Sequence, residues 1–313
     1  MAVKKKISVL TACYNESENV DDLSAQIKAV FEGLPEYDYE HVFIDNCSTD
    51  DTVAKIRALA SKDSHIKAIL NARNFGHIRS PFYGILQCDG DAVIMMASDL
   101  QDPPPLIRDF VKKWEEGFKI VVGVKHKSEE NPVMFAVRKL YYNMIHWLSD
   151  VDQVKNFTGF GLYDKKFVDV LRGLDISYPY FRGLIAELGF ERTEVEFVQP
   201  KRARGVTKNN FYTLYDMAMT GFVNHSKVPL RLASFVGFPL ALLSLGVAVG
   251  YTIYKLLNWN DFVVGTAPMV IGLFFFASVQ LFFIGVLGEY VGAVYTQVHK
   301  RPLVIEKERI NFD

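Results

Sequence analysis

The sequence predicts an α/β protein, with a mostly parallel β-sheet between helices and a C-terminal pair of membrane-spanning helices. Two observations lead to this prediction. Over the first two hundred residues, short β-branched segments alternate with amphipathic helical patterns, which is typical of β-α-β units. Two long stretches nearer the C-terminus then carry no charge. The 313 residues are enough for about two structural units.

Five apolar segments are predicted as strands buried on both faces. Each is short, rich in β-branched residues and bounded by turn-forming residues. They are residues 7–12, 41–44, 66–70, 92–96 and 120–124.

Helical patterns lie between these strands. The first places Val20, Leu23 and Ile27 on one face, with Ser17 and Asn19 as candidate caps. The prolines at 103–105 predict the start of another helix, because proline suits the first helical turn. Strand and helix alternate as a parallel sheet with right-handed crossovers requires.

Polar side chains follow four of the predicted strands. Any one of these clusters could simply cap a helix or close a turn. In parallel sheets, however, ligands bind beyond the carboxyl ends of the strands, so four clusters in such positions predict a ligand site. They are Tyr-Asn-Glu at 14–16, Asp-Asn-Cys-Ser-Thr-Asp at 45–50, Arg-Asn-Phe-Gly at 73–76 and Ser-Asp-Leu-Gln-Asp-Pro-Pro at 98–104.

Composition and motifs exclude several classes of protein. The 35 basic and 36 acidic residues give a net charge of −1, which does not favour nucleic acid as a partner. The three cysteines have no paired spacing, so neither a disulfide framework nor a zinc site is indicated. The sequence has no Gly-x-Gly-x-x-Gly and no Gly-Lys-Ser/Thr loop, which argues against dinucleotide and P-loop chemistry.

Two uncharged stretches are long enough to cross a bilayer. Residues 232–254 contain 23 residues and residues 262–288 contain 27, against the roughly 20 that a span needs. A buried core hairpin is the alternative, but soluble helices of this length are rarely apolar on every face. Basic residues flank the pair on both outer sides, so the positive-inside rule predicts that the large N-terminal domain and both termini are cytoplasmic.

The chain is thus divided into four parts. Residues 1–208 are expected to form a cytoplasmic domain that includes an amphipathic helix at about 133–148, and residues 209–227 a juxtamembrane amphipathic helix. Both amphipathic helices could lie in the membrane interface, or could be ordinary core-facing helices. Residues 228–298 form two transmembrane helices, and residues 299–313 form a cytoplasmic tail.

The ordered set of motifs resembles the family 2 glycosyltransferases, which have the GT-A fold. The similarity is greatest to the polyprenyl-phosphate glycosyltransferases, a group that includes bactoprenol glucosyltransferases and dolichyl-phosphate mannose synthase. Besides the four clusters, it is carried by Arg-x-x-Gly-x-Thr-Lys at 202–208 and by the two apolar stretches, which end in Gly-Glu-Tyr at 288–290.

This resemblance implies an activity. The expected reaction is inverting transfer of a sugar, by preference glucose, from a UDP-sugar to undecaprenyl phosphate. It implies Mg²⁺ or Mn²⁺ as cofactor, because the diphosphate leaving group needs a divalent ion. It also implies a multi-pass protein of the bacterial inner membrane, with a homo-oligomer as one expectation.

By the same resemblance, residues are expected in three roles. Asp99 and Gln101 would hold the metal. Catalytic roles fall to Asp99, Arg202 and Lys208. The nucleotide-sugar pocket would comprise Ala12, Tyr14, Asn15, Glu16, Asp45, Ser48, Arg73 and Asp99, and the acceptor phosphate would meet Lys125, Arg202, Thr207 and Lys208.

Three positions depart from the family pattern, and the first is Ala12, which replaces the usual proline before Tyr-Asn-Glu. Ala97 stands where the first Asp of the metal segment is usual, and Gly159 stands where a catalytic base is often proposed. A base is dispensable if the attacking group is a phosphate oxygen, which is already ionised with a second pKa of about 6. Gly159→Asp is therefore expected to leave turnover within about tenfold.

Other functions stay open on the sequence. Ala97 and Gly159 would also suit a catalytically silent, membrane-anchored sensor or scaffold that binds a nucleotide sugar. The sugar could be GlcNAc or mannose in place of glucose. A processive polysaccharide synthase is disfavoured, because no Gln-x-x-Arg-Trp motif occurs.

Overall fold

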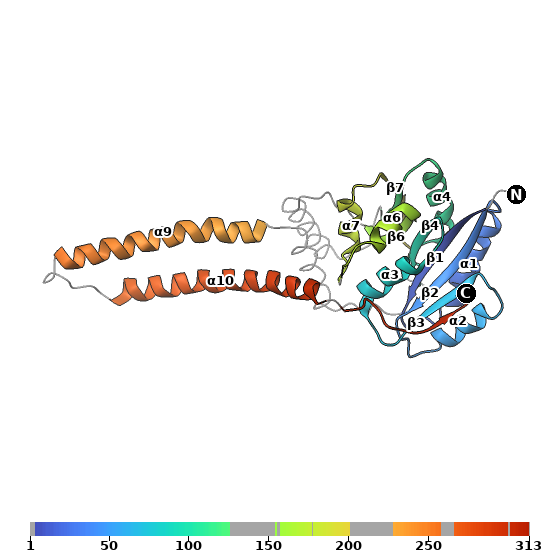
Figure 1. Ribbon diagram of the computed structural model, residues 1–313, viewed down its shortest axis with the longest axis horizontal. Helices are drawn as coiled ribbons and strands as arrows, with labels where there is room; N and C mark the ends of the chain where they lie inside the picture. The colour runs from blue at the N-terminus through green and yellow to red at the C-terminus, as the bar shows by residue number, and fades with distance from the viewer. Residues whose placement is uncertain are drawn as a thin grey trace.

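The structure is a computed structural model that describes residues 4–125, 154, 157–176, 178–200, 228–257, 266–299 and 301–312. Figure 1 shows an α/β body from which two long helices extend side by side. The interface helices predicted at 133–148 and 209–227 lie outside the described residues.

The body is built on one sheet with strand order β7-β5-β6-β4-β1-β2-β3-β8. β6 and β8 run antiparallel to their neighbours, and the other pairs are parallel, as predicted. The strands are β1 (Lys5–Cys13), β2 (Tyr37–Asp45), β3 (Ile66–Asn71), β4 (Ala92–Ala97), β5 (Ile120–Lys125), β6 (Phe157–Asp164), β7 (Arg192–Phe197) and β8 (Glu306–Ile310).

All five predicted strands are present, as β1 to β5. β6, β7 and β8 were not predicted. Lys125, expected just after the fifth strand, is the last residue of β5, because its pairing with β7 continues to Phe197.

Helices cover both faces of the sheet. One face carries α1 (Val20–Glu32), α2 (Thr52–Ala60) and α4 (Ile107–Glu115), with α4 preceded by the 3₁₀ turn η1 (Pro104–Leu106) at the predicted prolines. The other face carries α3 (Gly76–Gln87), α6 (Lys165–Arg172) and α7 (Phe181–Glu187).

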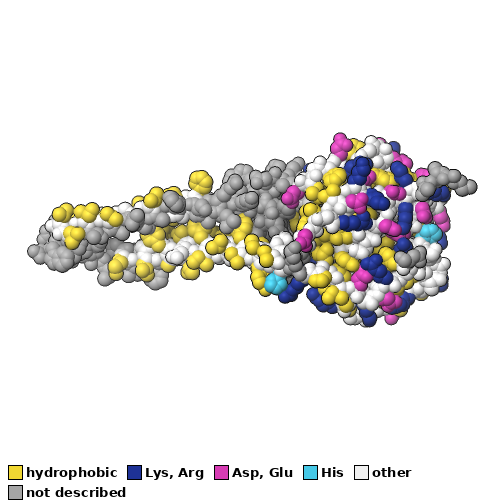
Figure 2. All heavy atoms as spheres, in the orientation of Figure 1, with side chains coloured by type: hydrophobic (Ala, Val, Ile, Leu, Met, Phe, Trp, Pro, Cys, Tyr) yellow, Lys and Arg dark blue, Asp and Glu magenta, His cyan; other side chains and the backbone are white. Residues whose placement is uncertain are grey.

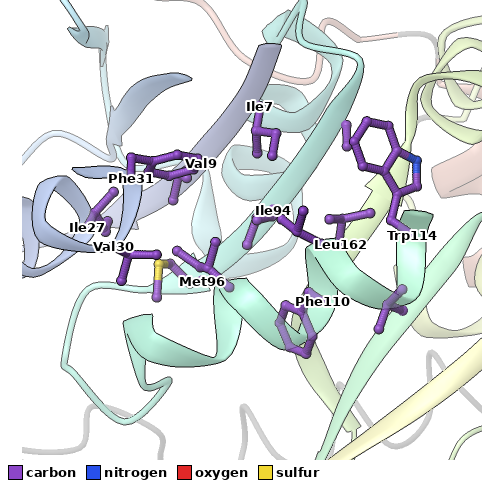
Figure 3. Packing of buried hydrophobic residues seen from close by; sticks show 14 of the residues in the cluster. Ile7, Val9, Ile27, Val30, Phe31, Ile94, Met96, Phe110, Trp114 and Leu162 are labelled. Carbon is purple, nitrogen blue, oxygen red and sulfur yellow. The ribbon is translucent and has the colours of Figure 1, made fainter. Parts of the chain in front are cut away.

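The two faces follow from the alternation of side chains along the strands. Val9 points toward α1 and α4, and Leu10 points toward α3. Figure 3 shows the first of these cores, where Ile27 and Phe110 meet strand residues such as Ile94. Strands buried on both faces therefore read as continuous apolar runs, which is why the pattern was recognisable in the sequence.

The predicted cap of α1 differs in detail. Asn19 occupies the N-cap position, but its side chain makes no capping bond and donates from Nδ2 to Glu16 Oε2 at 2.7 Å. At α2, Asp50 Oδ1 accepts from the backbone N–H of Thr52 at 3.0 Å, and so pairs one N–H group of the first helical turn.

The two C-terminal apolar stretches are helical, as α9 (Val228–Leu257) and α10 (Thr266–Val298). Within the described residues, Phe275–Val298 is the one helical segment long and apolar enough to cross a membrane, and none of it is buried. Figure 2 shows hydrophobic side chains along this hairpin, where Leu281 and Tyr295 are 69% and 63% exposed. Such a large exposed apolar surface on a water-soluble protein would favour association with another protein or with a membrane.

The C-terminal segment corrects one expectation. Residues 299–313 were predicted only as a tail, with no strand named in them, and residues 306–310 form β8 on the open edge of β3. Four of its five residues are charged, and only pairing with the neighbouring strand makes such a short segment extended.

Buried His41 makes unfolding pH-dependent. Burial lowers its pKa to about 3, while Nε2 lies 3.0 Å from Thr11 Oγ1. Because the unfolded chain binds the proton at higher pH, stability is lost as pH falls from about 6.5 toward 3, by up to about 1.4 kcal/mol per pH unit.

We expect His41→Gln to reduce the slope of the unfolding free energy against pH between pH 4 and 6, measured by urea denaturation. His65→Gln, at an exposed position, is the control, and an unchanged slope in His41→Gln would contradict the assignment.

Candidate active site

The loops that follow β1, β2, β3 and β4 meet at one edge of the sheet. We call this edge the rim and define it as residues 12–16, 45–50, 72–76 and 97–104. Strand register sets its level, because Ala12 pairs with Ile44 on one side and with Ala97 on the other. All four predicted polar clusters lie in the rim.

A hydrogen-bonded triad joins the first two loops. Asp45 is 1% exposed, and Ser48 donates to it from Oγ to Oδ1 and from its backbone N–H to Oδ2 at 3.0 Å. Ser48 Oγ in turn accepts from the N–H of Asn15 at 2.9 Å, and Asn15 Oδ1 accepts from the N–H of Thr49 at 2.7 Å. The two loops therefore form one rigid unit.

Asp50 and Thr52 extend this unit toward Glu16. Thr52 Oγ1 accepts from the N–H of Glu16 at 2.8 Å and donates to Asp50 Oδ1 at 2.5 Å. Partial burial would raise the pKa of Asp50, but hydrogen bonds from Thr52 and Ser17 outweigh it and hold that pKa below its usual value. Asp50 is thus an ionised part of the rim.

Two asparagines attach the third loop. Asn46 Nδ2 donates to Asn74 Oδ1 at 2.9 Å, and Asn46 Oδ1 accepts from the N–H of Phe75 at 2.8 Å. The guanidinium of Arg73 lies 4.0 Å from the ring centroid of Phe75 and stays exposed. A cation is thereby presented at the rim.

The fourth loop holds two carboxylates close together. Asp99 and Asp102 are each 5% exposed. Asp99 Oδ1 accepts from the N–H of Gln101 at 3.2 Å, and Asp102 Oδ2 accepts from the N–H of Ala97 at 2.8 Å. The loop is therefore folded around its own acidic side chains.

Burial and neighbouring charges shift the pKa of Asp102 in this loop. Burial raises the pKa of Asp102 to about 6. The N–H of Ala97 and the charge of Lys125 oppose this shift, whereas the negative charge of Asp99 adds to it. Lys125 is thus close enough to act on the loop. A divalent cation with oxygen ligands would relieve the repulsion between the carboxylates.

In the described part of the chain, no cluster of three or more His, Cys, Asp or Glu side chains could hold a metal ion by itself. Ala97, at the position of the missing acidic residue, is exposed at the rim. A cation here would need oxygen ligands from a substrate or water in addition to Asp99.

Backbone strain is concentrated at the rim. Asn15, Cys47 and Leu100 have positive φ values of 56°, 66° and 59°. Among the described residues, the only other non-glycine with positive φ is Asn311, at 57°. Such strain collects at functional sites, because the surrounding contacts must hold it.

Gly159 revises a sequence-based expectation. It lies on β6 with φ of 109°, a conformation that side chains rarely adopt, and an added Cβ would lie 2.5 Å from Met95 Cε. The backbone therefore favours glycine here, and Gly159→Asp is expected to cost stability, whereas its expected small effect on turnover stays a prediction.

The structure brings most predicted site residues together. Those in or beside the rim are Ala12, Tyr14, Asn15, Glu16, Asp45, Ser48, Arg73, Asp99, Gln101 and Lys125. Arg202, Thr207 and Lys208 lie outside the described residues. Roles for Asn46 and Asp102 were missed, although each belongs to a polar cluster that the sequence singled out.

Comparison with known proteins adds family relationships. Residues 8–168 match the family model described as "Glycosyl transferase family 2". The chain is 33% identical over 301 residues to "Uncharacterized glycosyltransferase sll0501" of Synechocystis, covering 96% of this chain and 94% of that one. It is 30% identical over 304 residues to the "SfII prophage-derived bactoprenol glucosyl transferase" of Shigella flexneri, covering 97% and 98%.

A solved structure has a more distant likeness. Mannosyl-3-phosphoglycerate synthase from Rubrobacter xylanophilus is 18% identical, with a TM-score of 0.47 over 69% of this chain and 71% of the other.

Ser48→Ala should loosen the rim. It leaves the N–H of Asn15 without its acceptor and removes a donor to buried Asp45, which costs about 1–3 kcal/mol of unfolding free energy. Ser61→Ala removes a hydroxyl that donates to Ala58 O at the exposed end of α2, and we expect it to cost less than about 0.5 kcal/mol. Equal urea midpoints for the two variants would contradict the role of Ser48.

Gly159→Asp should lower the thermal midpoint. A non-glycine residue at this φ costs about 1–3 kcal/mol, before the contact with Met95 is counted. Gly173→Ala is the control, because Gly173 has φ of −77° and only ordinary contacts. If both variants melt with the wild-type protein, β6 does not need glycine there.

Proposed function

Because the chain belongs to glycosyl transferase family 2 and is a glycosyltransferase, we propose that it transfers a sugar from a UDP-sugar to a polyprenyl phosphate at a membrane surface. Glucose and undecaprenyl phosphate are the preferred pair. The relatives named bactoprenol glucosyl transferase, aligned over nearly their whole length, support this choice.

The nucleotide is proposed to lie across the first two loops of the rim. Asp45, Ser48 and Asn15 fix their shape, and Arg73 offers a positive charge beside them. Tyr14 and Glu16 are half-buried at the same edge. A rigid polar surface with one nearby cation suits a uridine diphosphate, because its binding then costs little reorganisation.

Asp99 is proposed to hold the divalent ion, with Gln101 beside it. The repulsion between Asp99 and Asp102 supports a cation at this loop. Since Ala97 supplies no carboxylate, diphosphate oxygens and water would complete the coordination. Mg²⁺ or Mn²⁺ when bound supplies positive charge that stabilises the departing diphosphate.

One observation carries the proposal for a lipid acceptor. β8 is antiparallel to β3, and its first residue, Glu306, pairs with Asn71 at the carboxyl end of β3. The chain that leaves α10 therefore reaches the sheet at the rim. Seven residues, or eight Cα–Cα steps, separate Val298 from Glu306, so the apolar helix ends within about 29 Å of the rim. A lipid headgroup beside that helix is within reach of a rim-bound sugar.

The reaction is a single displacement. An oxygen of the lipid phosphate forms a bond to the anomeric carbon, while the bond from that carbon to the diphosphate oxygen breaks and the electron pair leaves with UDP. Attack from the opposite side inverts the anomeric configuration. No base is needed, because the attacking phosphate is already ionised. Lys125, together with Arg202, Thr207 and Lys208 of the basic motif, is proposed to position that phosphate.

We propose that both α9 and α10 span the inner membrane, with the catalytic domain and both termini in the cytoplasm. The uncharged stretches at 232–254 and 262–288 and their basic outer flanks support this topology. A second candidate, a silent nucleotide-sugar sensor, is favoured by one observation, the exposed Ala97 in place of an acidic ligand. Nucleotide binding without turnover in the presence of lipid would support it.

Asp99→Ala should abolish turnover. We expect kcat/KM to fall at least about a hundredfold, because the leaving group loses its electrostatic stabilisation. The assay is nucleotide release by purified protein with undecaprenyl phosphate, Mn²⁺ or Mg²⁺ and a panel of UDP- and GDP-sugars, with mass spectrometry of the lipid. EDTA should stop the reaction, and added metal should restore it.

Asp109→Ala is the matched control, because Asp109 is an exposed carboxylate on α4. It should retain wild-type turnover. Full activity of Asp99→Ala, or of the wild type in EDTA, would exclude the proposed metal role. Absence of turnover with every sugar would refute the transferase reaction with a polyprenyl acceptor.

A further inference from the structure

The segment after α10 is bound to the catalytic domain from Leu303 to Phe312. We call residues 301–312 the strap. It pairs with β3 through β8, and Ile305 O accepts from the N–H of Ala72 at 2.9 Å. Val304 is 6% exposed, and Leu303 and Phe312 pack against the core beside α3. The strap is therefore a docked element.

Charged side chains fix the strap in one register. Arg57 of α2 makes a two-point ion pair with Glu308, at 2.6 and 2.5 Å. Tyr83 of α3 donates to Glu306 at 2.8 Å, and Arg309 donates to Gln87 at 2.6 Å. A shift by one residue would separate these pairs and turn each side chain to the other face.

The far end of the strap is anchored as well. Asn311 has φ of 57°, and its Nδ2 donates to Ala60 O at 2.8 Å and to Ile66 O at 2.9 Å. Asn311 therefore fixes the end of the strap. Its side chain pairs two backbone carbonyls, and a shift of the strap along β3 would leave both acceptors unpaired.

The near end of the strap bears on the rim. Ala72, held by Ile305, directly precedes Arg73. Asn71, the last residue of β3, donates to Asn46 Oδ1 at 3.2 Å, and the same oxygen accepts from the N–H of Phe75. The segment that comes from α10 is thus linked to the loop that carries Arg73.

We propose that the strap positions the catalytic domain. Because its length is fixed, it keeps the rim facing the membrane and at a fixed distance from the bilayer. A tether of seven residues between Val298 and Glu306 allows little freedom, whereas a longer one would let the domain tilt and move away from the membrane. The part of this inference that concerns lipid substrate rests on the proposed transfer reaction, and the part that concerns orientation rests only on the proposed membrane insertion of α10.

The test lengthens the tether and leaves β8 intact. Ten Gly/Ser residues are inserted between Arg301 and Pro302 of the full chain. The control is the same insertion after Gly117, an exposed turn between α4 and β5. Neither insertion removes a contact of the strap, so both proteins are expected to fold.

Orientation is read by energy transfer to a headgroup-labelled lipid in vesicles. Single dyes are placed at Asp51→Cys, at the rim end of α2, or at Ser61→Cys, at its other end about 14 Å away, in a Cys47→Ser background. In the wild type and in the control, the dye at residue 51 should transfer energy to the lipid label more strongly than the dye at residue 61. The insertion at 301 should at least halve this difference between the two positions. An undiminished difference overturns the proposal, whether or not the protein transfers a sugar.

Catalysis gives the second readout. With the insertion at 301, the KM for undecaprenyl phosphate in vesicles should rise about tenfold or more, while kcat/KM for a short, water-soluble prenyl phosphate stays within about twofold. Equal losses with both acceptors would overturn the proposal, because they indicate damage to the rim itself. A wild type that uses neither acceptor refutes the proposed function, and the energy-transfer result still decides on the strap.

A pair of charge variants checks the strap's attachment. Glu308→Arg faces Arg57 with a like charge and should reduce the energy-transfer difference, and the added change Arg57→Glu should restore it. Glu116→Arg, which disrupts the exposed Lys113–Glu116 pair on α4, should leave it unchanged. Failure of the double variant to recover would contradict the role of this ion pair.

Discussion

Parallel pairing at the centre of the sheet is the constraint on which the site depends. β1 lies between β2 and β4, and all three strands end at one edge. Residues distant in sequence, such as Asn15, Ser48 and Asp99, are therefore brought to the same rim. The hydrogen bonds of Asp45 and Asn46 then fix loops whose backbone is strained at Asn15 and Cys47. A flexible edge could not hold such conformations.

The antiparallel edge strand adds a second constraint. A parallel β8 would have brought the chain from α10 to the opposite edge of the sheet, away from the polar loops. As it stands, Glu306 meets Asn71 at the rim, so the apolar hairpin and the candidate active site are joined by a short segment. In the proposed reaction, this short connection would let a water-soluble sugar donor and a lipid acceptor meet without a large domain movement.

Much of this architecture could be predicted from the sequence, because strands buried on both faces are apolar throughout. Val9, Ile44 and Ile94 are examples. β6 was missed because its glycines interrupt the apolar pattern. β8 was missed because its charged residues are extended only by pairing with β3 and with partners such as Arg57. The polar clusters were recognised, but the part played by Asp102 depends on burial and on the neighbouring charge of Asp99, which no linear pattern reveals.

Gly159 illustrates the same limit. Its identity looked like the loss of a catalytic base, whereas the backbone at φ of 109° requires glycine. Ala97, which stands where the resemblance expects a carboxylate, is exposed at the rim, and a change in ligand supply at this position stays a prediction.

The most direct test of the account is a structure of the full chain in a lipid nanodisc with UDP and Mn²⁺. The account predicts diphosphate and metal density at the Asp99 loop, on the edge of the sheet that faces the bilayer. Nucleotide density at the opposite edge, or a metal bound away from Asp99, would contradict it.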